Sequence, residues 1–362
     1  MTAGVARIPS LDGIRAVAIG GGFGIHANGA LPGGHLGVSV FFVLSGYLIT
    51  TLLLEEHRQD GAVDFRRFYL RRGVRLLPAL FVVLLVYSGF LLITGTSSGE
   101  VLTGVLASAL YSGNLVHAYV PSLEFSDFTW SWTLSLEEQF YFLWPAVLIA
   151  AARRGALRRI AVALAVLLLV SEALRVFLPL GDPDRSARIY AGVDTRMSGL
   201  LLGALLALFL AARPVRMSDR WAGLLAGGSV AAILASYMFA RLGTRPAYAL
   251  WIPVVEFASA GLVLAVLSRP DGSIPRSLAW EPVTHVGRIS YGLYLWNIPA
   301  YHLTQDLFAA GTPVWKTGSV WLLATFTLAE VSFYGLERPV QRRWRGAARP
   351  LPQEHRSVLV NS

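Results

Sequence analysis

The sequence has 362 residues, of which 54% are hydrophobic and only 15% charged, and its formal net charge is +9. Soluble domains carry about 25% charged residues, so this composition excludes an ordinary soluble protein and predicts a polytopic membrane protein. The absence of cysteine excludes thiolate nucleophiles, cysteine-bound zinc and disulfides. Because the charge is almost all arginine, with Lys316 the only lysine, we attribute it to cytoplasmic loops and expect no nucleic-acid partner.

Apolar segments that suit membrane crossing follow one another along the whole chain. A transmembrane helix needs about 20 apolar residues. We predict ten spans, near residues 12–30, 36–54, 76–94, 131–152, 158–178, 197–212, 221–240, 247–268, 289–309 and 317–336. A further apolar run, 101–118, is ambiguous. The expected fold class is therefore all-α, a polytopic transmembrane helical bundle of about ten spans.

Arginine placement predicts the orientation of the bundle, because basic loops stay in the cytoplasm. Arginines cluster in loops 55–75, 153–159, 213–220 and 269–288 and after residue 337. If all these loops are cytoplasmic, both termini are cytoplasmic and the chain crosses an even number of times between 75 and 153. Segment 101–118 then either does not cross or belongs to an external or re-entrant hairpin. The alternative of eleven spans would place an arginine-rich loop outside.

The domain organisation follows from the same pattern. We assign residues 1–345 to a single transmembrane domain and residues 346–362 to a polar, disordered cytoplasmic tail. The expected location is the cell membrane, with several passes through the lipid bilayer.

The first predicted span contains ionisable residues inside the apolar stretch LDGIRAVAIGGGFGIHANG (11–29). Arg15 and His26 are 11 residues apart, which in an α-helix is about 20° of rotation and about 16 Å of rise, so they share one face. Asp12 lies within ion-pair reach of Arg15. Ionisable groups in a membrane are costly and usually functional, and imidazole suits general-base work on a hydroxyl. We interpret His26 as a candidate base, whereas Arg15 either assists it or snorkels to the interface.

The segment FRRFYLRRGVRLLP (65–78) leads into the third span. Arg67, Arg71 and Arg75 recur at helical spacing, and Arg72 and Arg75 form an RxxR pair. One interpretation is simple anchoring by positive charge. The other is a cytoplasmic anion clamp for phosphates, which suits the forked guanidinium group.

Later segments add acidic candidates. In FTWSWTLSLEEQFYFLWP (128–145), Glu137 and Glu138 lie within an aromatic span, and one of them is expected to face a wet cavity. Asp194 and Arg196 are expected at the outer mouth of a span. Glu337 beside Arg338 is either functional or a boundary pair. The sequence contains neither the spacing of metal ligands nor the GxSxG signature of hydrolases.

Taken in order, these motifs resemble the acyltransferase 3 family of integral-membrane O-acyltransferases. The resemblance runs from about residue 8 to 345 and rests on LDGIRAVAI with a later histidine, GHLGVSVFFVLSGYLIT (34–50), RRGVRLLPAL (71–80), WTLSLEEQFYFLWP (132–145), VGRISYGLYLW (286–296) and ERP (337–339). It implies a ten-helix bundle that moves an acyl group from cytoplasmic acyl-CoA to a hydroxyl. Acceptors in this family include bacterial surface sugars and glycosylated macrolides.

The resemblance also implies residue roles. The family's Arg-x10-His pattern matches Arg15 and His26, its RxxR pattern matches Arg72 and Arg75, and the glutamate of its closing motif matches Glu337. The family often has a histidine after YLW, where this chain has Asn297. The candidate catalytic residues are His26, Arg15, Glu337 and Glu138. The candidate residues for the acyl-CoA phosphates are Arg71, Arg72 and Arg75.

The expected function is transfer of an acetyl or short acyl group from acyl-CoA to a hydroxylated saccharide or a glycosylated natural product. His26 would take the hydroxyl proton, and acyl-CoA would be a co-substrate rather than a permanently bound cofactor. Direct transfer and a two-step route through an acylated residue both stay open. The alternatives are a proton-coupled small-molecule transporter, which also uses buried ionisable residues, and a non-catalytic membrane scaffold.

Overall fold

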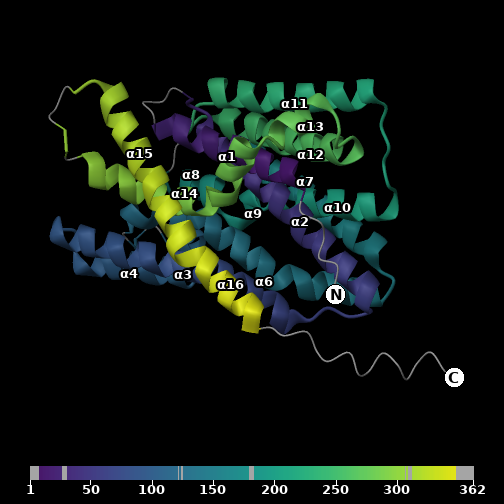
Figure 1. Ribbon diagram of the computed structural model, residues 1–362, viewed down its shortest axis with the longest axis horizontal. Coiled ribbons are helices and arrows are strands. Elements are labelled where there is room, and N and C mark those ends of the chain that lie inside the picture. Colours follow the sequence, from purple (N-terminus) through teal and green to yellow (C-terminus); the bar gives the residue numbers. More distant parts are fainter. Residues whose placement is uncertain are drawn as a thin grey trace.

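A computed structural model describes residues 8–26, 31–120, 122–123, 125–178, 183–305, 307–308 and 312–347. All regular secondary structure within these ranges is helical, which confirms the all-α fold class (Figure 1). The predicted polar tail lies outside the described residues from position 348 onward.

Ten helices of the described chain overlap the ten predicted spans, although residues 27–30, 306 and 309 of those spans lie outside the described residues. They are α1 (Pro9–His26), α2 (Gly37–Asp60), α3 (Phe65–Ile93), α6 (Trp132–Arg153), α7 (Leu157–Phe177), α10 (Ser198–Ala212), α11 (Asp219–Phe239), α12 (Ile252–Ser268), α14 (Glu281–Gln305) and α15 (Val314–Ser332). The connecting elements are η1 (Gly34–Leu36), α4 (Ser98–Ala109), α5 (Gly113–Tyr119), η2 (Ser126–Ser131), α8 (Pro183–Ala191), α9 (Val193–Arg196), α13 (Ser273–Leu278) and α16 (Arg338–Ala347), with π-helical turns η3 (Ala247–Trp251) and η4 (Phe333–Glu337).

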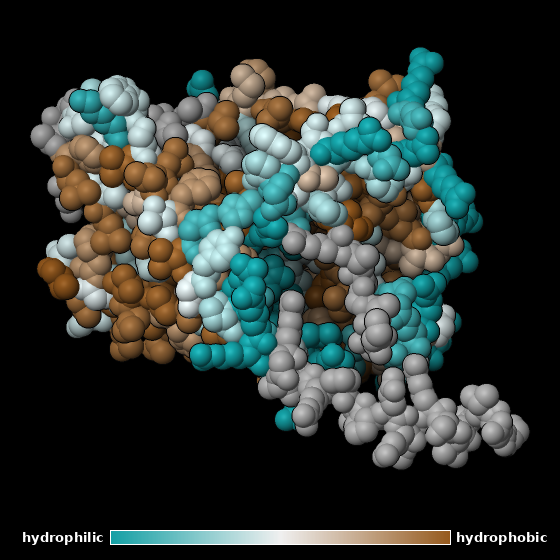
Figure 2. All heavy atoms as spheres, in the orientation of Figure 1, coloured by the Kyte–Doolittle hydropathy of each residue, from teal (hydrophilic) through white to brown (hydrophobic). Residues whose placement is uncertain are grey.

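Six described helical segments are long and apolar enough to cross a bilayer, so the chain is a multi-pass membrane protein. They are Gly34–Asp60, Phe65–Ile93, Leu157–Phe177, Asp219–Phe239, Ala247–Ser268 and Trp315–Trp344. Figure 2 shows a broad hydrophobic surface over the end of the molecule where α3 and α4 lie. Leu85 and Ile93 of α3 and Leu102 of α4 expose large apolar side chains there. The count of ten spans and the cytoplasmic placement of both termini stay predictions.

The ambiguous segment 101–118 is not one helix. It is divided between α4, of 12 residues, and α5, of 7 residues. At the break, Tyr111 has a φ of 52°, a left-handed conformation that is costly for a residue with a side chain. Neither helix has the roughly 20 residues that a crossing needs.

The turn between α2 and α3 follows from local sequence. Gly61 ends α2 because its φ of 70° is accessible to glycine, and its N–H donates to the carbonyl of His57 at 2.9 Å. Asp64 then starts α3, since its carboxylate accepts the N–H of Arg67 at 2.9 Å. This turn brings the arginine-rich start of α3 back towards the end of α2.

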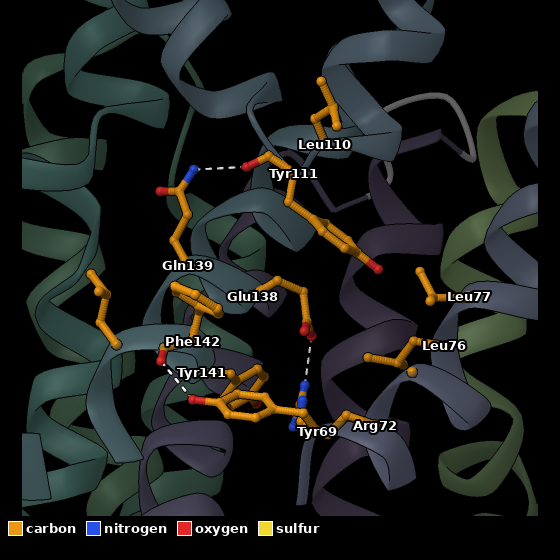
Figure 3. A pocket seen from close by; sticks show the side chains of 12 residues that line it. Tyr69, Arg72, Leu76, Leu77, Leu110, Tyr111, Glu138, Gln139, Tyr141 and Phe142 are labelled. Atoms are coloured by element: carbon orange, nitrogen blue, oxygen red, sulfur yellow. Dashed lines mark hydrogen bonds and ion pairs between the residues drawn. The ribbon is translucent and has the colours of Figure 1, made fainter. Parts of the chain in front are cut away.

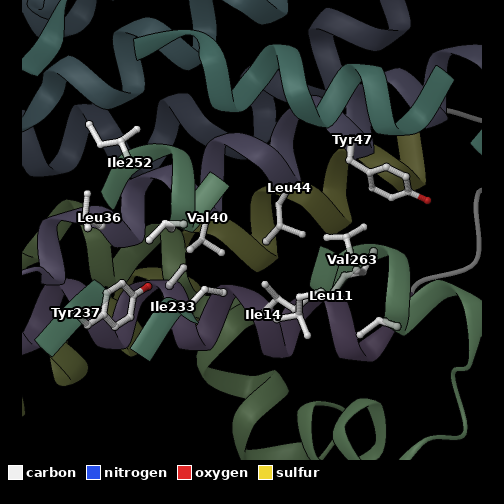
Figure 4. Packing of buried hydrophobic residues seen from close by; sticks show 14 of the residues in the cluster. Leu11, Ile14, Leu36, Val40, Leu44, Tyr47, Ile233, Tyr237, Ile252 and Val263 are labelled. Atoms are coloured by element: carbon white, nitrogen blue, oxygen red, sulfur yellow. The ribbon is translucent and has the colours of Figure 1, made fainter. Parts of the chain in front are cut away.

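Close helix contacts build the centre of the bundle, where α2 packs on α10 and α1 packs on α14. A side chain at Gly46 would place its Cβ 2.0 Å from the carbonyl oxygen of Leu200, and one at Gly287 would lie 1.9 Å from that of Asp12. Only glycine permits these approaches. The largest hydrophobic cluster fills the space between α1, α2, α11 and α12 (Figure 4).

A buried ionic network joins α7, α10 and α12. Arg175 donates to the carbonyl of Thr195 at 2.5 Å and to the hydroxyl of Ser198 at 2.7 Å. Its Nη2 lies 3.8 Å from Oε2 of Glu256, and Ser198 donates to the other carboxylate oxygen at 2.9 Å. Glu172 also pairs with Arg175 at the partly exposed end of the network. These contacts satisfy charges that would otherwise be costly inside the bundle.

Candidate functional site

A cavity of about 760 Å³ opens between α1, α2, α3, α6, α14 and α16. Its wall brings together most of the predicted site residues: Arg15, Arg71, Arg72, Arg75 and Glu138. These residues come from three helices that are far apart in the sequence. The grouping of four arginines and a glutamate on one cavity makes it the candidate active site.

Arg72 and Glu138 form the central ion pair of this wall, at 2.5 Å between Nη2 and Oε1 (Figure 3). The guanidinium carbon of Arg72 also lies 3.4 Å from the centre of the Tyr141 ring, a cation–π contact. A second cavity of about 430 Å³ is lined by the same three residues and by Tyr111. The Arg72–Glu138 pair therefore stands in the wall that the two cavities share.

Glu137 faces the main cavity as well, with different partners. The hydroxyl of Ser45 on α2 donates to Oε1 of Glu137, and the hydroxyl of Tyr141 donates to the same oxygen at 2.8 Å. From the sequence we expected one of the two glutamates, without saying which, to face a wet cavity; in the structure both line the main cavity. Consecutive residues point about 100° apart on a helix, so one can meet α3 while the other meets α2.

The third polar residue of this run has a structural task. Gln139 donates to the backbone carbonyl of Tyr111 at 2.8 Å and to the side chain of Asn114 at the same distance. It thereby holds the left-handed break between α4 and α5, and with it the tyrosine side chain that lines both cavities (Figure 3). A strained backbone residue held next to a cavity is typical of functional sites.

The remaining predicted arginines surround the main cavity. Arg15 pairs with Asp12 at 3.2 Å, as predicted from their spacing. Arg71 lies 3.5 Å from Glu56, at the end of α2. Arg75 has an exposed side chain that faces the cavity, and the charges of Arg15 and Arg72 act on it. The site is thus strongly positive on the α1 and α3 sides.

Two predicted catalytic residues do not appear in the cavity wall. Glu337 is buried in η4, accepts a hydrogen bond from Ser332 at 3.2 Å, and reaches the site only through its charge, which acts on Arg75. His26 is the last residue of α1, but its side chain lies outside the described residues. The structure does show that one continuous helix joins Arg15 to His26.

Sequence reasoning missed several residues of the wall. Ser45 stands in the apolar run VLSGYL, where a polar residue was the available signal. Tyr141 gave no signal beyond its aromatic span. Gln341 and Trp344 belong to α16, which lies against α3 and contributes to the cavity (Figure 1). The position of α16 depends on packing that the local sequence does not encode.

Asp194 and Arg196 lie elsewhere, and neither lines the two cavities described here. Asp194 accepts hydrogen bonds from Arg188 at 3.0 Å and from Tyr119 at 2.8 Å. Burial and the Asp194 carboxylate raise the pKa of Tyr119 to about 12, so this tyrosine stays a donor at neutral pH. Arg196 is buried over the Trp132 ring, at 5.4 Å.

Among the described residues, no three histidine, aspartate or glutamate side chains group as metal ligands would. The candidate site therefore consists of guanidinium, carboxylate, hydroxyl and aromatic groups. Such a set can bind anions and move protons.

Comparison with known proteins gives consistent matches along the chain. Residues 8–334 match the acyltransferase domain of the acyltransferase 3 family. The peptidoglycan O-acetyltransferase OatA of Listeria monocytogenes is 31% identical over 359 residues, covering 92% of this chain and 56% of the relative. The O-acetyltransferase OatA of Staphylococcus aureus is 30% identical over 373 residues, covering 98% of this chain and 61% of the relative. The chain thus spans little more than half the length of these relatives. No solved structure matches.

Proposed function

Because the chain belongs to the acyltransferase 3 family, we propose that it is an integral-membrane O-acyltransferase that uses acyl-CoA as its donor. The observation that carries this proposal is the cavity on which arginines from α1 and α3 meet carboxylates from α6. The names of the relatives favour acetyl as the acyl group.

The donor would bind by its phosphates at the arginine-rich side of the cavity. Coenzyme A carries a diphosphate and a further phosphate, which forked guanidinium groups bind through paired hydrogen bonds. Arg71 and Arg75 are placed for this role, and Arg72 would join them while it holds Glu138. The pantetheine arm would then extend the thioester into the bundle between α2 and α6.

The acceptor would supply a hydroxyl whose proton must be removed. We keep His26 as the base for this proton on the strength of the sequence, with Arg15 near it on α1. Glu138 acts through Arg72, and Glu337 acts through Arg75. In this assignment the two glutamates position arginines, and the histidine does the proton transfer.

The acceptor is proposed to be a carbohydrate. Both relatives are named O-acetyltransferases and one is named for peptidoglycan, which favours a cell-surface glycan over a glycosylated macrolide. A saccharide hydroxyl needs both a base and an activated acyl donor held close to it.

The test is acceptor-dependent release of CoA by the purified protein in detergent. Acetyl-CoA and longer acyl-CoAs serve as donors, and saccharides, cell-wall fragments and glycosylated macrolides serve as acceptors. We expect His26→Ala to abolish release and Arg75→Ala to raise the KM for the donor. Arg159→Ala, at an exposed arginine of α7 away from the cavity, is the matched control and should behave as the native protein.

The outcomes separate the possibilities. Unchanged release by His26→Ala would remove the histidine from the mechanism. An unchanged donor KM in Arg75→Ala would remove the proposed phosphate site. If the native protein neither binds nor turns over any acyl-CoA, the acyltransferase proposal fails and substrate transport by reconstituted protein becomes the next measurement.

A further inference from the structure

We propose that Ser45 is a nucleophile that carries the acyl group between donor and acceptor, with Glu137 as its base. This inference rests on the proposed acyltransferase function and specifies its route as two steps. It follows from hydrogen bonds that join α2 to α6 at the wall of the main cavity.

The hydroxyl of Ser45 is directed at a carboxylate on another helix. Ser45 is 8% exposed, lines the cavity, and donates to Oε1 of Glu137, which lines the same cavity. Tyr141 donates to that oxygen too, at 2.8 Å. A carboxylate oxygen within hydrogen-bond reach of a hydroxyl is placed to receive the proton of that hydroxyl.

This arrangement differs from that of several other buried hydroxyls in the described helices. Serine and threonine inside helices commonly donate to the carbonyl four residues earlier. Ser135, Ser236, Ser259 and Thr304 do so here. Ser45 leaves its own helix and donates to a carboxylate instead.

Two other buried serines also donate to carboxylates. Ser332 donates to Glu337, and neither of these residues lines the cavities described here. Ser198 donates to Glu256. Arg175 donates to Ser198 and pairs with Glu256, and neither of these two partners lines the cavities described here. That contact holds helices together. Among the serines that the structure describes, only Ser45 combines a carboxylate acceptor with a place in the wall of the candidate active site.

The base is itself held in place, as it is in known nucleophile–base pairs. Tyr141 orients Glu137, the guanidinium of Arg72 lies 3.4 Å from the centre of the Tyr141 ring, and Glu138 holds Arg72 at 2.5 Å. A chain of direct contacts therefore runs from the proposed phosphate site to Ser45. Binding of the donor phosphates and alignment of the nucleophile are linked through it.

The neighbouring glycine fixes the position of Ser45. Gly46 packs on α10 so closely that a Cβ would lie 2.0 Å from the carbonyl oxygen of Leu200. Ser45 lies about 100° around the helix from this contact, which turns it towards α6. In the segment Ser45–Gly46–Tyr47, the glycine thus fixes α2 against α10, and this contact sets the direction in which the serine points.

The chemistry balances without any further reagent. In the first step Ser45 Oγ attacks the thioester carbon, and Glu137 takes the hydroxyl proton. A C–O bond forms, the C–S bond breaks, and the proton passes from Glu137 to the departing CoA thiolate. In the second step the acceptor hydroxyl attacks the Ser45 ester while His26 takes its proton. A C–O bond to the acceptor forms, the C–O bond to Ser45 breaks, and His26 gives up the proton that the serine oxygen takes back.

The test is exchange of label between radioactive CoA and unlabelled acetyl-CoA, in native protein without acceptor. A two-step enzyme catalyses this exchange because acylation is reversible, whereas direct transfer requires the acceptor. We expect the native protein to exchange label, and Ser45→Ala and Glu137→Gln to lose it by about 100-fold or more. Ser88→Ala, at a half-buried serine of α3 that does not line the cavity, should exchange normally.

Two further readouts separate a nucleophile from a structural hydroxyl. Mass spectrometry of digested protein after brief incubation with acetyl-CoA should find one acetyl group on the peptide that contains Ser45. Ser45→Ala should keep the native affinity for acetyl-CoA and the native unfolding transition, since only the chemical step is removed.

The inference is overturned if Ser45→Ala exchanges label at the native rate, or if the native protein releases CoA with an acceptor yet exchanges none without it. In the second case the acyltransferase function stands and transfer is direct. If the native protein shows neither exchange nor acceptor-dependent release, the proposed function fails and this inference fails with it.

Discussion

The Arg72–Glu138 pair allows a quantitative prediction about how the site is held. Truncating Arg72 to alanine removes a charge-assisted hydrogen bond of 2.5 Å and a cation–π contact of 3.4 Å. The first contributes about 1.5–3 kcal/mol and the second about 0.5–1 kcal/mol. Both side chains are about one-fifth exposed, at 23% and 18%, so solvent screens the pair only in part. We therefore expect Arg72→Ala to lower the free energy of unfolding by about 2–4 kcal/mol.

The assay is equilibrium unfolding of purified protein in mixed detergent micelles, applied to a double-mutant cycle. The cycle combines Arg72→Ala, Glu138→Ala and the double variant, because only the coupling term isolates the pair. We expect a coupling energy of about 1.5–3 kcal/mol. A matched control is Arg58 and Glu55, which are 2.9 Å apart but 78% and 30% exposed. Such a surface pair should couple by only about 0.2–1 kcal/mol.

The refuting result is equally specific. If the Arg72–Glu138 coupling is no larger than that of the surface pair, the wall between the two cavities is not held by this ion pair. The chain of contacts from the phosphate site to Ser45 would then lose its first link. A different result would assign the pair a purely structural role. In that case the two residues couple in the free energy of unfolding, but Arg72→Ala leaves acyl-CoA turnover unchanged.

Three further predictions concern packing and donor recognition. Gly46→Val should prevent the close approach of α2 and α10 and greatly reduce the yield of folded protein, measured by size-exclusion chromatography, whereas Gly223→Val, which meets nothing within 4 Å, should not. Glu256→Ala leaves a buried arginine without one of its carboxylates and should lower the free energy of unfolding in mixed micelles by about 3–5 kcal/mol; a loss under 1 kcal/mol would contradict this account. Trp344→Ala removes an aromatic contact from the cavity wall and should raise the KM for acyl-CoA by about threefold to tenfold, whereas Trp315→Ala, 69% exposed and away from the cavity, should not.

Most of the helical framework follows from local sequence. Long apolar runs predict the helices because each backbone group in a bilayer must find its partner within the same segment. The turn at Gly61 and Asp64 depends only on residues within a few positions of each other. The Asp12–Arg15 pair was predictable for the same reason, since three residues along a helix bring the side chains together.

The candidate site is built from residues that are far apart in the sequence, so its contacts could not be predicted from local sequence patterns. Arg72 and Glu138 are 66 residues apart in the sequence, and Ser45 and Glu137 are 92 apart. Nothing in the sequence around either residue of a pair identifies the residue that it contacts. The question of which glutamate faces a cavity was therefore undecided in the sequence, and the structure resolved it by giving each glutamate its own partner.

The sequence by itself determined that this is a helical membrane protein, which segments are apolar, and which arginines and glutamates are candidates for the site. These properties are set by composition and by spacing within one helix. Only the tertiary structure decided that α1, α2, α3, α6 and α16 converge on one cavity, that Glu337 does not line it, and that Ser45 meets Glu137. The physical reason is that helix packing is governed by shape, where glycines allow backbones to approach, and the partners of each face are chosen from the whole chain.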